Sequence, residues 1–109
     1  MAGLGGNQNG AVTFDVDENR EGTVTVSLAG ELDITNVDAL AAAAAPAIER
    51  SPQRLVIEVG QLRFADSSAI ALWVQWAAVV PNIELRDVSP LLRRVVESMG
   101  LSQTLNLES

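Results

Sequence analysis

The sequence predicts a single α/β domain in which helices cover a small mixed sheet of four to five strands. Its 109 residues, 48% of them hydrophobic, suffice for one compact domain with its own core. Segments with the period-two alternation of strands are followed by segments with helical spacing. The predicted order is strand, strand, helix, strand, helix, strand, helix, which is typical of a sheet whose connecting helices pack on it.

The N-terminal segment MAGLGGNQNG is rich in glycine and has no hydrophobic period. Residues 1–10 are therefore predicted to be a flexible tail and residues 11–109 the domain, with regular structure beginning near Val12. VTFDV and TVTVSLAG, residues 12–16 and 23–30, alternate apolar and polar residues, and the second segment is expected to face Val24, Val26 and Leu28 toward the core. The polar DENREG between them is typical of a hairpin loop.

A first helix is expected after the second strand. Thr35 can cap a helix in which five apolar residues recur at helical spacing, namely Val37, Leu40, Ala41, Ala44 and Ile48. Pro46 removes a backbone donor inside this segment, so the helix is predicted either to kink there or to end near Ala45.

Strand and helix patterns then alternate. RLVIEV, residues 54–59, is predicted to be a short buried strand, and residues 67–80 a helix that Pro81 stops. IELRDV, residues 83–88, alternates again as a strand does.

The last helix is the best delimited. Ser89 can cap it, Pro90 suits its first turn, and Gly100 follows its end. Its apolar stripe is predicted to consist of Leu92, Val95, Val96 and Met99.

Composition excludes several classes of function. The chain has neither cysteine nor histidine, so disulfides, thiol chemistry, an imidazole base and a zinc site are not expected, and we predict no metal or cofactor. A net charge of −7 disfavours nucleic acid as a partner, because its phosphates would be repelled. The apolar run from residue 69 to 80 is shorter than the about 20 residues of a membrane helix, and no signal peptide is evident. We therefore expect a cytoplasmic protein that does not insert into membranes.

Three short blocks resemble a known family. GELD, residues 30–33, follows the second predicted strand, and FADSS, residues 64–68, follows the third. VSPLLRRVVESMGL, residues 88–101, lies near the C-terminus. In order and spacing they resemble the signature regions of the STAS domain, the fold of bacterial anti-sigma factor antagonists, over roughly residues 12–107. The resemblance implies a STAS-like domain.

The resemblance also implies a function and a site. In that family the serine directly after the aspartate is phosphorylated by a partner anti-sigma factor that is a kinase, and the matching residue here is Ser67. The unphosphorylated form binds the anti-sigma factor and frees a sigma factor, and phosphorylation reverses this. The implied protein is a transcription regulator and not an enzyme, with Asp33 near Ser67. Ala69 departs from the glycine common at its position, and the second helix is shorter than usual.

The residues themselves leave the role of the triplet Asp66-Ser67-Ser68 open. A serine at a helix start can satisfy backbone N–H groups, so Ser67 can be a cap, and Asp33 or Asp66 can each close a turn. A phosphate on Ser67 would instead add about −1.5 to −2 charge at pH 7, which a helix N-terminus tolerates but an acidic or apolar partner surface would not. We predict that Ser67 is the phosphoacceptor and that Ser68 supports the helix start.

The helix that follows the triplet has an unusually apolar outer face. A helical wheel places four apolar residues around Gln75, namely Ala71, Leu72, Ala78 and Val79, with Trp76 at their border. Either the tail or a neighbouring helix covers this face, or it binds a partner and Trp76 is an anchor. The predicted partner-binding residues are Asp33, Asp66, Ser68, Ala69, Leu72 and Trp76.

Two alternatives to the phosphorylation switch remain. One is a non-phosphorylated STAS subunit of a lipid-transport ABC system, in which such a domain docks on the ATPase, or of another regulatory complex. The other is an enzyme that uses Ser67 as a nucleophile or Asp33 and Asp66 as an acid–base pair, which is disfavoured because no histidine or lysine accompanies them.

Overall fold

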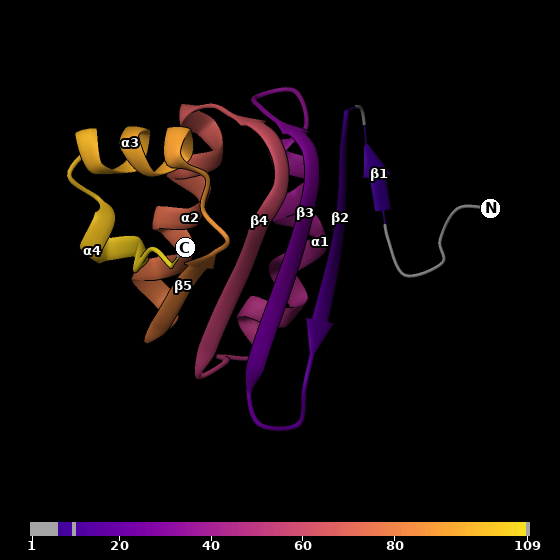
Figure 1. Cartoon of the computed structure of the whole chain (residues 1–109). Coiled ribbons are helices and arrows are strands. Elements are labelled where there is room, and N and C mark those ends of the chain that lie inside the picture. The colour runs from indigo at the N-terminus through magenta and orange to yellow at the C-terminus, as the bar shows by residue number, and fades with distance from the viewer. Residues whose placement is uncertain (1–6, 10, 109) are drawn as a thin grey trace.

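The computed structural model describes residues 7–9 and 11–108. It confirms an α/β domain built on one five-stranded sheet in the order β1-β2-β3-β4-β5, with α1 and α2 on one face, α4 beside β5 and α3 past the end of β5 (Figure 1). The elements are β1 (Asn7–Asn9), β2 (Val12–Glu18), β3 (Thr23–Leu32), α1 (Val37–Glu49), β4 (Arg54–Ala65), α2 (Ser67–Val79), β5 (Asn82–Arg86), α3 (Pro90–Ser98) and α4 (Ser102–Leu105). β1, β2 and β3 pair antiparallel, whereas β3, β4 and β5 are parallel.

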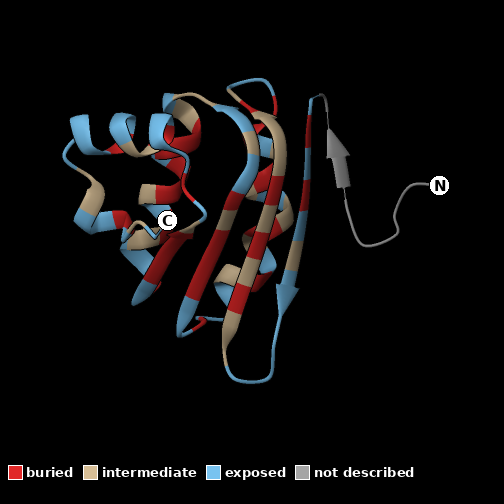
Figure 2. Cartoon of the chain, viewed as in Figure 1, coloured by how far each residue is buried: buried red, intermediate tan, exposed pale blue. Residues whose placement is uncertain are grey.

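The alternation of the sequence is visible in the burial of the strands (Figure 2). Val24, Val26 and Leu28 of β3 are buried, as predicted, and the residues between them are only partly buried. These side chains pack with those of α1 and α2 in one core that includes Trp73, which is fully buried.

The sheet has more edge structure than the sequence pattern predicted. Asn7–Asn9 falls in the predicted tail but forms β1 and pairs antiparallel with β2, so described structure begins before Val12. The rest of that predicted tail, residues 1–6 and 10, lies outside the described residues. At the other edge Leu107 bridges Leu85, whose N–H donates to the Asn106 carbonyl at 3.2 Å. Both segments are too short for a period-two pattern to mark them.

β4 is twice as long as the six-residue strand that we predicted, because it continues to Ala65 beside β3. Its first half pairs with β5 only as far as Glu58, opposite Arg86. The second half pairs with β3 through two register shifts and ends with Ala65 opposite Leu32. Residues 60–65 contain glycine, glutamine and arginine, so they carry no hydrophobic period from which a strand can be predicted.

α1 begins and ends differently from the prediction. Its N-cap position is Asn36 and not Thr35, and the helix runs through Pro46 to Glu49 instead of ending near Ala45. Pro46 is exposed, so its ring lies on the outer face, and burial of Ala47 in the core stabilises the final turn. Tertiary packing thus outweighs the hydrogen bond that the proline removes.

α3 begins as predicted. The Ser89 side chain accepts a hydrogen bond from the Leu92 N–H at 3.1 Å, and Pro90 occupies the first turn. Of the predicted apolar stripe, Leu92 and Val96 are buried, but Val95 and Met99 are exposed. The core therefore uses only part of the apolar surface of α3.

A buried carboxylate lies on the sheet face opposite α1 and α2. Glu84 is only 4% exposed, and it accepts hydrogen bonds from Arg54 at 2.5 Å and from Arg86 at 2.6 Å. The Arg54 hydrogen bond is the main cause of a pKa below the ordinary value for Glu84, and Arg86 adds to it while burial opposes it. The two guanidinium groups compensate the burial of this charge.

Gly30, in the GELD block, has a conformation and a contact that require glycine. Its φ is +95°, and a Cβ there would stand 2.1 Å from the Ala11 carbonyl oxygen. That carbonyl accepts a hydrogen bond from the Glu31 N–H at 3.0 Å, which fixes β2 against β3. A side chain at residue 30 would separate the two strands.

We therefore expect Gly30→Ala to lower the free energy of unfolding by about 3 kcal/mol, from overpacking and the left-handed backbone together. Gly100→Ala is the matched control, because φ is +74° there but nothing lies within 4 Å of the added Cβ. It should cost only about 1 kcal/mol. Urea unfolding of both variants measures the difference, and equal losses would show that the Ala11 carbonyl does not matter.

Candidate functional site

The ends of β3 and β4 bring the GELD and ADSS blocks together. Parallel strands end at the same edge of a sheet, and here Leu32 is the register partner of Ala65. The Asp66 N–H donates to the Leu32 carbonyl at 3.2 Å, and the Ile34 N–H donates to Asp66 Oδ2 at 3.1 Å. The two loops that carry Asp33 and Ser67, which the resemblance implied to be near each other, are therefore joined directly.

The turn from β3 to α1 is held by its own side chains. Asp33 Oδ1 accepts hydrogen bonds from the N–H and the hydroxyl of Thr35. The side chain of Asn36, which is buried, accepts from the Asp33 N–H and donates to the Glu31 carbonyl, both at 2.9 Å. Asp33 therefore closes a turn, one of the two roles open to it from the sequence. The role of Asn36 was missed, although asparagine three residues after aspartate is a recognisable turn signal.

Asp66 is the N-cap of α2. Its Oδ1 accepts from the Ser68 N–H at 2.9 Å and the Ala69 N–H at 3.3 Å, and also from the Ser68 hydroxyl. Burial raises the pKa of Asp66, but the hydrogen bonds from the Ser68 hydroxyl and from the N–H groups of Ala69, Ile34 and Ser68 outweigh it, so the pKa lies below its ordinary value. The capping role that Ser67 could have had belongs to Asp66.

Ser67 is the first residue of α2 and is exposed. Within the described part of the chain its hydroxyl makes no hydrogen bond, whereas the Ser68 hydroxyl is bound to Asp66. Ser68 thus supports the helix start, as predicted, and the neighbouring hydroxyl is left accessible. Asp33 reaches this corner through Ile34 and Asp66, because the described residues show no hydrogen bond between Asp33 and Ser67.

The predicted apolar partner surface on α2 needs correction. Leu72 and Trp76 are only 7% and 5% exposed, and Ala69 is fully buried, so none of the three side chains offers a partner more than a small area. The wheel considered only the packing of α2 on the sheet, but α1 and α4 also contact this helix and cover its flanks. The alternative that a neighbouring helix covers this face is correct for these positions.

A shallow groove remains between α1 and α2, next to Ser67. Its volume is about 250 Å³, and it is lined by Ile34, Val37, Asp38, Ala41, Ser68, Ala71, Leu72 and Gln75. Ile34 is 70% exposed and stands in the turn that Asp66 holds. Ile34 is not among the site residues predicted from the sequence, although an isoleucine within a polar turn directly after GELD is a signal that identifies it.

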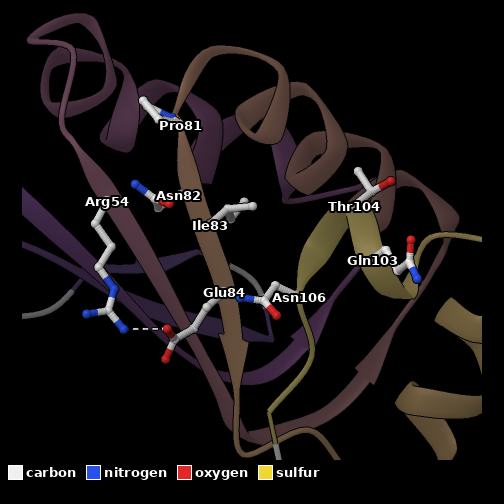
Figure 3. Close-up of a pocket in the computed structure, with 8 residues that line it drawn as sticks. All are labelled: Arg54, Pro81, Asn82, Ile83, Glu84, Gln103, Thr104 and Asn106. Carbon is white, nitrogen blue, oxygen red and sulfur yellow. Dashed lines mark hydrogen bonds and ion pairs between the residues drawn. The ribbon is translucent and has the colours of Figure 1, made fainter.

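A larger hollow lies elsewhere, at the edge of β5 (Figure 3). It measures about 460 Å³, and its lining is mostly polar, with the ion pair of Arg54 and Glu84 at one side. None of the predicted site residues lines it. Among the described residues no cluster of acidic side chains could hold a metal ion, and no helix is long and apolar enough to cross a membrane.

Comparisons with known proteins agree with the fold. The structure is similar to an anti-sigma factor antagonist from Mycobacterium paratuberculosis, with a TM-score of 0.78 and 25% identity over 88% of this chain and 84% of that one. It is also similar to the anti-sigma factor antagonist SpoIIAA in its unphosphorylated form, with a TM-score of 0.74 and 25% identity over 88% of each chain. The phosphorylated form of SpoIIAA, a Bacillus cell fate determinant, is similar with a TM-score of 0.68 and 25% identity over 88% of this chain and 91% of that one.

Among curated protein sequences, none matches this chain significantly. The family described as "Mlab, STAS domain" matches residues 15–108, which include the GELD block, the serine pair and α3. That match extends over most of the 109 residues. The chain therefore belongs to the STAS domain family, which the three sequence blocks had indicated.

Proposed function

We propose that this protein is an anti-sigma factor antagonist whose partner is an anti-sigma factor with serine kinase activity, and that Ser67 is the phosphoacceptor. One observation carries the proposal: because Asp66 caps α2, the exposed Ser67 hydroxyl has no structural role among the described residues. The similarity to SpoIIAA, which was solved in unphosphorylated and phosphorylated forms, supports it.

The domain itself tolerates a phosphate on Ser67, whereas a partner surface packed against this corner would not. The phosphate would lie at the N-terminus of α2, where the helix dipole favours negative charge. The N–H groups of Ser68 and Ala69 are already bound to Asp66, so the phosphate gains few backbone donors and stays exposed. The phosphate adds about −1.5 to −2 charge beside Asp66 at pH 7. Any partner surface that packs on this corner must then bury that charge.

The unphosphorylated corner has a surface that a partner can bind. Ile34 is an exposed apolar side chain at the end of the groove between α1 and α2, and Ala41 and Ala71 allow close approach. Ser68 lines the same groove, so Ser67 borders it. A phosphate at this border disrupts an interface that depends on apolar burial, which explains how one modification could switch binding off.

A second candidate is a constitutive STAS subunit, for example in a lipid-transport ABC system. The family that matches carries the name Mlab and not that of an antagonist, and Ala69 replaces the glycine of the resemblance. Such a subunit would bind through the same groove without needing Ser67 to be modified.

Incubation with candidate anti-sigma kinases and ATP should add one phosphate, which fragmentation by mass spectrometry should locate on Ser67. Ser67→Ala should abolish labelling, and Ser68→Ala is the matched control that should still be labelled. Ser67→Ala protein labelled to the wild-type extent would contradict the assignment. Failure of every kinase, together with stable copurification with an ATPase subunit, would favour the second candidate.

The division of roles between Asp66 and Ser67 predicts different effects on stability. Asp66→Ala should lower the free energy of unfolding by about 1 to 2 kcal/mol through loss of the cap, whereas Ser67→Ala should change it by less than about 0.5 kcal/mol. The pKa of Asp66 is below its ordinary value of 3.8, so its ionised form stabilises the fold above that pH and the contribution is lost as pH falls through the folded-state value.

Urea unfolding at neutral and acidic pH measures both effects. The difference between wild type and Asp66→Ala should shrink on acidification. A larger loss for Ser67→Ala than for Asp66→Ala would assign the cap to Ser67 instead.

Ile34→Asp should weaken binding of the anti-sigma factor that phosphorylates Ser67 by about 2 kcal/mol or more, because it places a charge on the exposed apolar surface beside Ser67. The control is Val79→Asp, since Val79 is an equally exposed apolar side chain at the far end of α2. Titration calorimetry measures both affinities, and unfolding curves check the fold. Equal affinities of the two variants would place the partner away from this groove.

A further inference from the structure

A second apolar surface lies between the end of β4 and α3, away from the groove between α1 and α2. We call it the α3 groove. It is a hollow of about 160 Å³, about the size of one large apolar side chain, and it is lined by Leu62, Arg63, Phe64, Ala65, Ser89, Leu91, Leu92 and Val95. Phe64 and Leu91 are 52% and 68% exposed, one on each side of it. Neither side chain contributes to the core.

The α3 groove exists because β5 stops before β4 does. β5 pairs with β4 only up to Glu58 opposite Arg86, and the positive φ of Asp87 then turns the chain toward α3. The last residues of β4 consequently have no strand beside them on that edge, and α3 stands there instead (Figure 1).

α3 presents more apolar surface than the core needs. Leu92 and Val96 face the core, whereas Leu91 and Val95, four residues apart, form a second stripe that faces the groove. Exposed apolar side chains from two separate elements that converge on one hollow are typical of a binding site for a protein segment.

One arginine lines the α3 groove and a second lies near it on α3, although the chain has a net charge of −7. Arg63 lines the groove and pairs with Glu31 only across 3.8 Å, with both side chains largely in solvent, so the pair is weak. Arg94 follows Leu91 by three residues, which places it beside Leu91 on the helix surface, and it forms no salt bridge with a described residue. Of the seven arginines, Arg63 thus lines the hollow and Arg94 lies beside one of its lining residues.

We propose that the α3 groove binds an acidic segment of a partner protein, which inserts one large apolar side chain between Phe64 and Leu91 and places carboxylates against Arg63 and Arg94. A second copy of this chain fits less well, because a two-fold interface on this patch would bring arginine rims together. The site is separate from Ser67 and does not depend on its phosphorylation.

The test uses ¹⁵N-labelled protein and three blocked pentapeptides at matched concentrations. The first has a central leucine with two glutamates on each side, the second replaces the leucine with alanine, and the third replaces the glutamates with lysines. The leucine–glutamate peptide should shift the amide signals of Phe64, Leu91, Leu92 and Val95 in a saturable way. Both other peptides should bind at least fivefold more weakly.

Variants assign the effect to the groove. Leu91→Asp should abolish the shifts, and the double variant Arg63→Glu, Arg94→Glu should weaken binding at least fivefold, whereas the exposed control Val79→Asp and Ser67→Ala should bind as wild type does. Unfolding curves confirm that these surface variants fold.

Three results would overturn the proposal. The first is an absence of shifts at millimolar peptide, and the second is equal shifts at the groove between α1 and α2. The third is sedimentation that shows a dimer which Leu91→Asp dissociates, because the groove would then be a contact between copies.

Discussion

The arrangement of the whole Ser67 corner depends on the carboxylate of Asp66. One oxygen holds the first N–H groups of α2, and the other holds the Ile34 N–H in the turn that follows β3. A single side chain therefore caps a helix and fixes the position of a loop that is 32 residues away in the sequence. Because Asp66 satisfies these donors, Ser67 is free for another role, and Ile34 is held exposed beside it.

Features that depend on neighbouring residues could be predicted from the sequence. The start of α3 follows from Ser89 and Pro90 alone, and the inward face of β3 follows from its alternation. The proximity of Asp33 and Ser67 was implied by the family resemblance, and it arises because the parallel strands β3 and β4 end at one edge of the sheet. These inferences need no knowledge of how separate helices pack.

Features that depend on distant residues could not be predicted in the same way. Leu72 and Trp76 are indistinguishable from surface residues on a helical wheel, and the packing of α1 and α4 against α2 buries them. The second half of β4 lacks a hydrophobic period, and its strand conformation comes from pairing with β3 across two register shifts. Asn36 at the N-cap position bonds back to Asp33 and Glu31, which a capping rule for α1 does not anticipate.

The length of β4 also connects the two surfaces. β4 continues past the end of β5 and ends opposite the end of β3. Its last residues therefore lie between an edge of β4 that pairs with no strand and the corner where the loops after β3 and β4 meet. Phe64 lines the α3 groove, and Ser67, three residues later, borders the groove between α1 and α2. The two grooves differ in charge, because Asp38 lines one and Arg63 lines the other. The two proposed interfaces, which lie on either side of a single strand end, therefore favour partner segments of opposite charge.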